Sequence, residues 1–197
     1  MTSAQTLLQL SGADLNPPRL RDVCLVLIDL QNEYLTGHLA LPGAKAAVAS
    51  AARLLARARA NGAWIFHVAH KGKPGGPFDR TSERGAIVPA LMPLAGELTI
   101  EKEWPNAFAR TDLQAHLSAT GHKNIVLAGF MTHMCVSSTA RAALDLGFRT
   151  TIDADSCATR DLPDGRGATI AAKTVHDVAL AELSDRFAII ARGDVLA

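Results

Sequence analysis

The chain contains 197 residues, which is enough for one domain with a substantial hydrophobic core. Hydrophobic residues make up 48% of the chain and charged residues 20%, a composition that excludes a disordered protein. The formal net charge of +1 gives no indication of a nucleic-acid partner or of an anionic membrane surface.

Cysteine content and apolar run length narrow the class of protein further. The three cysteines lie far apart and include no C-x-x-C pair, which argues against a disulfide framework and against a structural zinc site. No apolar run approaches the roughly 18 residues that cross a bilayer, and no signal peptide is apparent. These features predict a cytoplasmic protein that does not enter a membrane.

Strand-like apolar runs alternate with helical patterns along the chain. The run 23–29 (VCLVLID) is almost continuously apolar, which is typical of a strand covered on both faces. The Ala-rich segment 44–60 predicts a helix that ends at Asn61-Gly62. Further strands are predicted at 63–69, 98–101, 123–128, 148–153 and 186–190, and further helices at 111–119, 136–146 and 167–183.

This order of elements predicts an α/β fold. We expect a three-layer α/β/α Rossmann-like sandwich with a mostly parallel sheet of about six strands. Ligands bind such sheets at the carboxyl ends of the strands, at a topological switch point. No G-x-G-x-x-G follows the first strand, so a dinucleotide site is unsupported.

The segment 129–136 (GFMTHMCV) is the most informative stretch for function. It follows a predicted strand and precedes a predicted helix, which places Cys135 close to a helix N-terminus. The N–H groups and the dipole at such an end stabilise an anion, so we expect a lowered thiol pKa and a nucleophilic thiolate. The alternative is that Cys135 is a small buried apolar residue.

Three ionisable residues fall at the carboxyl ends of three predicted strands, namely Asp29, Lys102 and Cys135. Alone, the aspartate could form a turn and the lysine could be a solvated charge. Together they suit nucleophilic catalysis: Asp29 takes the thiol proton, Lys102 keeps that carboxylate ionised, and Cys135 attacks an sp² carbon. The backbone N–H groups of Met131 and Cys135 are candidates to stabilise the oxyanion.

The chain resembles the isochorismatase-like hydrolases, also called the cysteine hydrolase superfamily. The resemblance runs in order from about residue 20 to 192. The matching pieces are 27–32 (LIDLQN), 41–44 (LPGA), 101–102 (EK), 106–108 (NAF) and 128–136 with Thr139, Arg141 and Ala142.

That resemblance implies a triad of Asp29, Lys102 and Cys135. It also implies a non-proline cis peptide bond at Phe130–Met131, which would aim the Met131 N–H at the oxyanion. Residues 1–20 would be an N-terminal extension and residues 21–197 the isochorismatase-like cysteine hydrolase domain. The extension could pack on the body or on a partner subunit, or fray. Members of the family are commonly homodimers or homotetramers.

Departures from better-known members bear on the substrate. Nicotinamidases carry a metal-binding Asp-x-His that this chain lacks, and His67 and His70, three apart on a strand, point to opposite faces. We therefore expect no metal and no other cofactor. Isochorismatases proper lack the nucleophilic cysteine, so Cys135 favours hydrolysis of a C–N bond in a small amide or ureide through a thioester-type intermediate.

Five further residues are candidates to bind the small-molecule substrate. The Gly/Pro-rich loop 71–80 follows the second strand and could be a lid or a solvated loop, and its basic residues could attract an anionic substrate. Aromatic walls with a few polar groups are usual in small-molecule sites, although each candidate could equally lie in the core or an interface. The expected wall residues are Phe78, Trp104 and Phe108, with Thr132 and His133 at the border.

Two other functions are compatible with the same fold. One is a metal-dependent nicotinamidase, which would lose its activity on chelation. The other is a catalytically idle member that binds a metabolite or a protein partner. The presence of Asp29, Lys102 and Cys135 together argues against the idle alternative.

Overall fold

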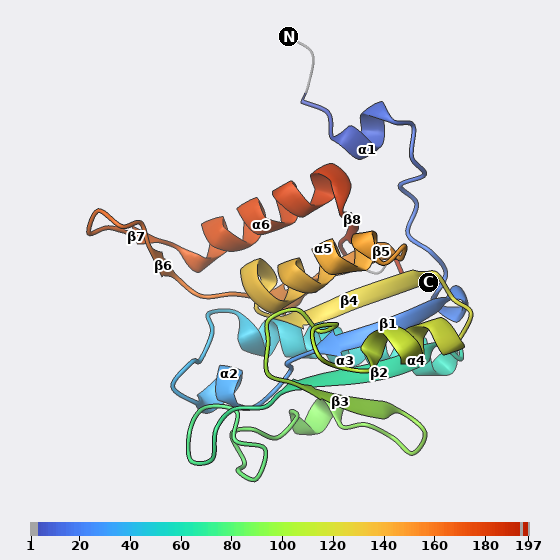
Figure 1. Cartoon of the computed structure of the whole chain (residues 1–197). Coiled ribbons are helices and arrows are strands. Elements are labelled where there is room, and N and C mark those ends of the chain that lie inside the picture. The colour runs from blue at the N-terminus through green and yellow to red at the C-terminus, as the bar shows by residue number, and fades with distance from the viewer. Residues whose placement is uncertain (1–3, 194, 197) are drawn as a thin grey trace.

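The computed structural model describes residues 4–193 and 195–196, and its centre is a six-stranded sheet (Figure 1). Neighbouring strands of this sheet are all parallel. Their spatial order is β3-β2-β1-β4-β5-β8, so the prediction of a mostly parallel sheet of about six strands is confirmed. In chain order they are β1 (Val23–Ile28), β2 (Trp64–His70), β3 (Leu98–Lys102), β4 (Asn124–Phe130), β5 (Arg149–Ala158) and β8 (Ala188–Ala191).

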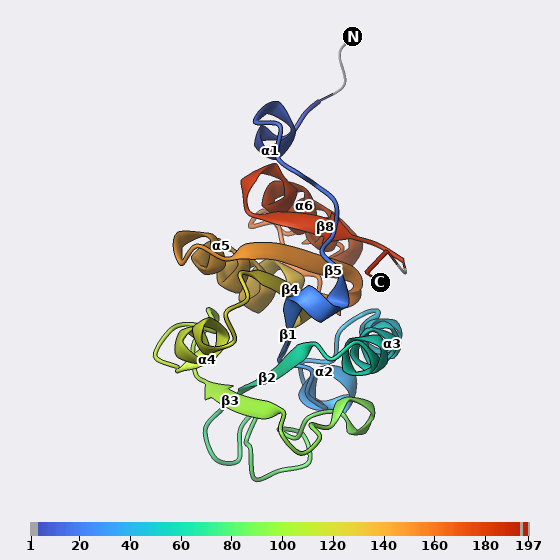
Figure 2. The same ribbon diagram turned by 90° about the vertical axis from the view of Figure 1, so that its right-hand side faces the viewer.

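Helices cover both faces of the sheet, as Figure 2 shows. One face carries α3 (Ala44–Ala60), and the other carries α4 (Leu113–Ala119), α5 (Ser137–Asp145) and α6 (Ala172–Arg186). The chain steps from β1 to β2 in one direction and from β3 through β4 and β5 to β8 in the other. Because crossover connections are right-handed, the two directions place their helices on opposite faces.

The core lies on both sides of the central strand β1. Leu25 and Leu27 pack into the cluster that includes the α3 residues Leu54 and Leu55. Cys24, Val26 and Ile28 pack into the opposite cluster, beneath α4, α5 and α6. Every residue of β1 is buried, which explains the continuous apolar run that predicted this strand.

The C-terminal part departs most from the predicted elements. Residues 167–171 do not belong to α6, because β6 (Leu162–Pro163) and β7 (Thr169–Ile170) form a small antiparallel hairpin there. Asp164 holds its turn, since Oδ1 accepts from the N–H groups of Arg166 (2.7 Å) and Ala168 (3.0 Å). The helix then runs beyond its predicted end at residue 183. The remaining short elements are α1 (Leu7–Leu10), η1 (Leu20–Asp22), α2 (Glu33–Thr36), η2 (Pro89–Leu91) and η3 (Thr132–Val136).

The N-terminal residues lie outside the sheet, beside α6 (Figure 1). The Leu7 N–H donates to Asp185 Oδ1 at 2.8 Å, and Arg149 Nη2 donates to the carbonyl oxygen of Asp14 at 2.6 Å. Of the alternatives for this segment, the described part of it therefore packs on the body of the same chain. Among the described residues, no helix combines the length and apolar character that a membrane crossing requires.

The sheet has its topological switch point between β1 and β4. The chain leaves β1 toward β2, whereas it leaves β4 toward β5 on the other side. Loops that leave in opposite directions open a crevice at the carboxyl ends of these two strands. The candidate catalytic residues lie at this crevice.

Candidate active site

Asp29, Lys102 and Cys135 come from three strand ends and are all buried. Asp29 follows β1 with φ 52°, and its N–H still donates to the Val68 carbonyl oxygen of β2 at 2.8 Å. Lys102 is the last residue of β3, and Cys135 lies in η3, immediately after β4. Their exposed fractions are 0%, 1% and 4%. Parallel strands end at the same edge, so the three residues converge there.

The Lys102 ammonium is the centre of the site. Its Nζ lies 2.6 Å from Asp29 Oδ2, 3.4 Å from Cys135 Sγ and 3.3 Å from His70 Nδ1. An ammonium has three N–H donors, so each donor has one acceptor in this arrangement. The three predicted triad residues are thus brought together, and His70, to which the sequence assigned no role, joins them.

The Cys135 thiol is protonated in this arrangement. Burial of the thiol and the negative charge of Asp29 raise the pKa of Cys135 to about 12, and Lys102 only partly opposes them. The lowered thiol pKa expected from the helix N-terminus is therefore wrong. The reason is that a side chain only 4% exposed loses more solvation than a helix end restores.

The Asp29 carboxyl is equally shielded from water. Burial raises its pKa, whereas the charge and the hydrogen bond of Lys102 oppose that rise. Its second oxygen, Oδ1, is buried and has no hydrogen-bond partner among the described residues. An unpartnered carboxylate oxygen close to a protonated thiol is well placed to accept a proton.

The turn between β4 and Cys135 holds the predicted cis peptide bond at Phe130–Met131, so that expectation is confirmed. The turn is packed tightly against β1, because a Cβ on Gly129 would lie 1.9 Å from the Ile28 carbonyl oxygen. The Met131 carbonyl oxygen accepts from the N–H of Val136 at 3.2 Å. This geometry places the Met131 and Cys135 backbones, the predicted oxyanion donors, on either side of one short turn.

The side chains of Thr132 and His133 form hydrogen bonds that tie this turn to the rest of the chain. Thr132 is fully buried, and its Oγ1 lies 2.9 Å from His176 Nδ1 of α6. His133 Nδ1 forms a hydrogen bond with Thr159 Oγ1, just after β5. Both residues lie in η3 itself, and their side chains contact α6 and the end of β5, so the predicted place at the border of the substrate pocket stays a prediction.

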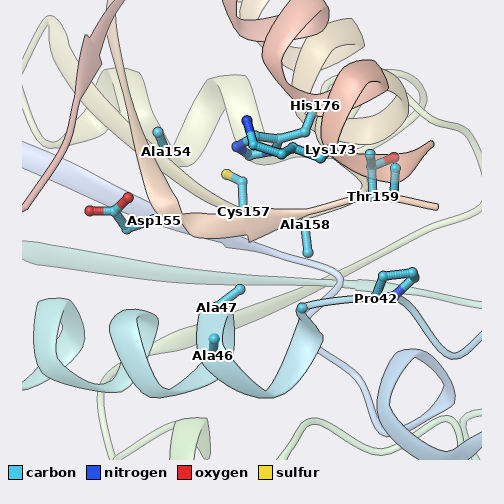
Figure 3. Close-up of a pocket in the computed structure, with 12 residues that line it drawn as sticks. Pro42, Ala46, Ala47, Ala154, Asp155, Cys157, Ala158, Thr159, Lys173 and His176 are labelled. Atoms are coloured by element: carbon cyan, nitrogen blue, oxygen red, sulfur yellow. The ribbon is translucent and has the colours of Figure 1, made fainter. Parts of the chain in front are cut away.

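The cavity drawn in Figure 3 lies behind the same turn. It has a volume of ≈ 380 Å³ and runs along the carboxyl half of β5, between the N-terminal ends of α3 and α6. Thr159 and His176, which hold the turn, are among its walls, and Cys157 also faces it (Figure 3). Asp29, Lys102 and Cys135 do not line it, so this cavity is separate from the triad.

Phe78 is the candidate wall residue that the structure brings to the triad. It is buried, and its ring centroid lies 4.9 Å from that of Tyr34 and 5.1 Å from that of His70. Tyr34 in turn meets Phe130 edge-on at 5.5 Å. Burial and then the charge of Asp29 raise the pKa of Tyr34, so this aromatic cluster is next to the candidate catalytic groups.

Of the other two aromatic candidates, Phe108 packs against another ring, whereas Trp104 lines a cavity together with Lys102. Phe108 stacks on Phe148 with the ring centroids 6.0 Å apart, and Phe148 precedes β5 at the amino end of the strands. The next residue toward the N-terminus, Ala107, donates its N–H to Thr139 Oγ1 of α5 at 3.0 Å, and a role of Phe108 in substrate binding stays a prediction. Trp104 is 48% exposed, with the Arg110 guanidinium 5.2 Å from its ring centroid. It lines a cavity of ≈ 240 Å³ beside Lys102.

The loop 71–80 is packed on the body rather than freely solvated. Lys71 and Arg80 form ion pairs with Glu101 of β3, at 3.1 and 3.2 Å. The Gly72 N–H donates to the Phe78 carbonyl oxygen at 3.0 Å, which closes the loop on itself. Two of the basic residues expected to attract an anionic substrate therefore already have a carboxylate partner.

Gln31 is a residue whose role the sequence did not indicate. Its Oε1 accepts from the His70 N–H at 2.8 Å, while its Nε2 donates to the carbonyl oxygens of His70 (3.0 Å) and Gly85 (2.7 Å). The Gln31 amide thus continues the pairing of β1 with β2 beyond the end of β1. The only signal was its place in the LIDLQN piece, which says nothing about a partner 39 residues away.

The two histidines of β2 have separate partners. His67 Nε2 lies 2.8 Å from Glu97 Oε2, whereas His70 faces Lys102. Among the described residues, no group of three or more His, Cys, Asp or Glu side chains is placed to hold a metal ion. The expected absence of a metal and of a cofactor stays a prediction.

Comparison with known proteins identifies the family. The isochorismatase domain matches residues 23–194. The chain is 38% identical over 168 residues to the secreted isochorismatase effector Isc1 of Verticillium dahliae, which covers 85% of this chain and 86% of that protein. It is 34% identical over 149 residues to the maleamate amidohydrolase of Pseudomonas putida, covering 67% and 70% of the two chains.

A solved structure agrees over almost the whole chain. The crystal structure of an isochorismatase from Pseudomonas putida has a TM-score of 0.92 and 44% sequence identity to this chain. The match covers 96% of this chain and 97% of that one. The protein therefore belongs to the isochorismatase family.

Proposed function

We propose that this protein is a cofactor-independent cysteine hydrolase that cleaves the C–N bond of a small amide or ureide. The observation that carries the proposal is the buried Lys102 ammonium, which lies 2.6 Å from Asp29 and 3.4 Å from Cys135. A thiol, a carboxylate and a cation at one strand edge are the groups that covalent hydrolysis through a thioester needs.

The first half of the reaction forms the thioester. Asp29 takes the Cys135 proton as Sγ attacks the carbonyl carbon, and the carbonyl π electrons move to oxygen. The backbone N–H groups of Met131 and Cys135 stabilise that oxyanion. When the oxyanion collapses, the C–N bond breaks, and the proton held by Asp29 moves to the departing nitrogen. Ammonia or an amine leaves, and the acyl group stays on Cys135.

The second half regenerates the thiol. Asp29 takes a proton from a water molecule, which attacks the thioester carbon through a second oxyanion. The C–S bond breaks, the acid leaves, and the proton returns from Asp29 to the Cys135 sulfur. Throughout, Lys102 offsets the negative charge that moves between Asp29 and Cys135, so the buried site never holds an unpaired anion.

Both the contacts and the relatives favour this function over a metal-dependent one. His67 and His70, the histidines that a metal site would need, contact Glu97 and Lys102 instead. The maleamate amidohydrolase of Pseudomonas putida, 34% identical to this chain, is named for the hydrolysis of an amide.

The test is a screen of primary amides and ureides for ammonia release, followed by two variants. Cys135→Ala and Asp29→Asn are each expected to remove at least about 10³ of kcat/KM, because the nucleophile and the base act as one unit. Cys24→Ala, which deletes a buried thiol of β1, is the matched control and should keep wild-type turnover. A Cys135→Ala variant within ten-fold of wild type would refute the mechanism.

A further inference from the structure

We propose that His70 is a positioning residue that holds the Lys102 ammonium between Asp29 and Cys135. This inference rests on the proposed function, because it assigns a role within the same site. His70 is the third acceptor of the Lys102 ammonium, and its hydrogen bond goes to Lys102 and not to Cys135 or Asp29. His70 Nδ1 lies 3.3 Å from Lys102 Nζ.

The sheet itself brings the two residues together. His70 and Lys102 are register partners, the last pair of the parallel β2–β3 ladder. Side chains of paired residues in parallel strands lie on the same face of the sheet. The imidazole therefore reaches the ammonium as a direct consequence of strand register.

The position of His70 is fixed from three directions. Gln31 accepts from its N–H at 2.8 Å and donates to its carbonyl oxygen at 3.0 Å, which holds the backbone. The Phe78 ring packs edge-on against the imidazole with the centroids 5.1 Å apart. A side chain restrained on its backbone and on one ring edge loses little further freedom when Nδ1 accepts a hydrogen bond.

The imidazole acts as a neutral acceptor. Burial and the Lys102 charge lower the pKa of His70, while Asp29 and Glu103 oppose that shift. A neutral imidazole carries one nitrogen that accepts a hydrogen bond, and the ammonium cannot act as the acceptor in this contact. Lys102 is therefore the donor, and His70 supplies the third lone pair that its ammonium requires.

Loss of this acceptor should affect the transition state more than substrate binding. Without it, one buried N–H of Lys102 has no partner, and the ammonium is free to move away from Cys135. The cation matters most when the sulfur becomes negative, so kcat should fall while KM changes little. We expect His70→Leu to lower kcat by about ten-fold or more, since hydrogen bonds to charged groups are the stronger class.

The experiment compares His70→Leu with His70→Asn. The Oδ1 of asparagine occupies the place of the imidazole Nδ1, two bonds from Cβ, so His70→Asn restores an acceptor and should recover most of kcat. His67→Asn is the matched control, because it removes a buried imidazole from the same strand. His67 contacts Glu97 and not the triad, so this control should lower the Tm and leave kcat unchanged.

A second readout does not depend on turnover. Iodoacetamide labelling, quantified by peptide mass spectrometry, compares Cys135 with glutathione in the same tube. Lys102 lowers the thiol pKa of Cys135, so its displacement in His70→Leu should slow the labelling of Cys135 several-fold relative to glutathione. His70→Asn should label at the wild-type ratio.

The outcomes separate this inference from the proposed function. If Cys135→Ala keeps its turnover, the proposed function is wrong whatever His70 does. If Cys135→Ala is inactive and His70→Leu keeps both kcat and the labelling ratio, only the positioning role is overturned. Equal losses of kcat in His70→Leu and His70→Asn would also overturn it, because the acceptor would then not be what matters.

Discussion

At the scale of single residues, the thiol of Cys135, the proposed nucleophile, is not ionised at rest. Its thiol pKa is raised to about 12 by burial and by Asp29, so the proton leaves only when a substrate carbon accepts the electron pair. Asp29 has a free oxygen for that proton, and Lys102 balances the charge on both residues. The proposed mechanism therefore relies on proton transfer coupled to the attack and not on a pre-formed thiolate.

This protonation state predicts slow alkylation. In the free protein, Cys135 should react with iodoacetamide at pH 7 more slowly than a free cysteine, whose pKa is about 8.5. Because a raised pKa keeps the thiolate fraction small, the rate should still be rising at pH 9. Rates are measured by peptide mass spectrometry, with glutathione in the same tube as the reference. A plateau of the Cys135 rate below pH 8 would contradict the raised pKa.

At the scale of elements, Glu97 joins three parts of the fold just before β3. It accepts from Arg59 of α3 at 2.7 Å, contacts His67 of β2 at 2.8 Å and accepts from the Leu94 N–H at 3.0 Å. Burial acts to raise its pKa, but these hydrogen bonds outweigh burial and lower the pKa to about 2. Glu97 thereby anchors the edge strand that carries Lys102.

The lowered pKa sets the pH range in which Glu97 stabilises the fold. Its contribution is present above the unfolded value of about 4.3 and is lost as the pH falls toward 2. Glu97→Gln should cost about 2 kcal/mol of unfolding free energy at pH 7, because it removes hydrogen bonds between charged groups. Urea unfolding at pH 7, 4 and 2.5 should show the difference from wild type shrinking with acid. A constant difference would contradict the assignment.

The strands β1, β2 and β4 could be predicted from sequence because burial on both faces leaves a continuous apolar run. The ends of β1, β2 and β3 fall within one residue of expectation, so Asp29 and Lys102 could be placed at the carboxyl edge. The β6–β7 hairpin was missed because its strands are only two residues long, although Pro163-Asp164-Gly165 is a turn signal.

The rest of the site depends on pairing between strands, which one sequence does not reveal. His70 faces Lys102 because of the β2–β3 register. Gln31 reaches a backbone 39 residues away, and Tyr34 meets a loop that folds back over it. The stacking of Phe108 on Phe148 could not be predicted either, since the path of an irregular loop is set by what it packs against.

At the scale of the whole molecule, the N-terminal residues and the triad are well separated. In Figure 2, α1 lies beyond α6 and β8, whereas β1, β3 and β4, which end at the triad, lie in the middle and at the other side of the sheet. Leu7 and Leu10 of α1 are 52% and 65% exposed, so this segment buries little apolar surface.

Removal of residues 1–11 is therefore expected to leave kcat and KM unchanged. The Tm should fall by only a few degrees, because the shortened chain can no longer form the hydrogen bond from Leu7 to Asp185, and such bonds contribute about 1 kcal/mol. Steady-state kinetics and a thermal melt of the shortened chain check both values. A large loss of activity would place the segment in the function of the site.

In chain order, the β6–β7 hairpin separates the part that carries the candidate catalytic residues from the part that carries none of them. Asp29, His70, Lys102 and Cys135 precede it, together with five of the six strands of the sheet, whereas α6 and β8 follow it. The later part supplies no reacting group but completes the core and holds Thr132 through His176. A cut at this exposed turn would therefore separate the triad from the segment that supports its turn, which makes the hairpin the place to test whether two pieces of the chain can reassemble.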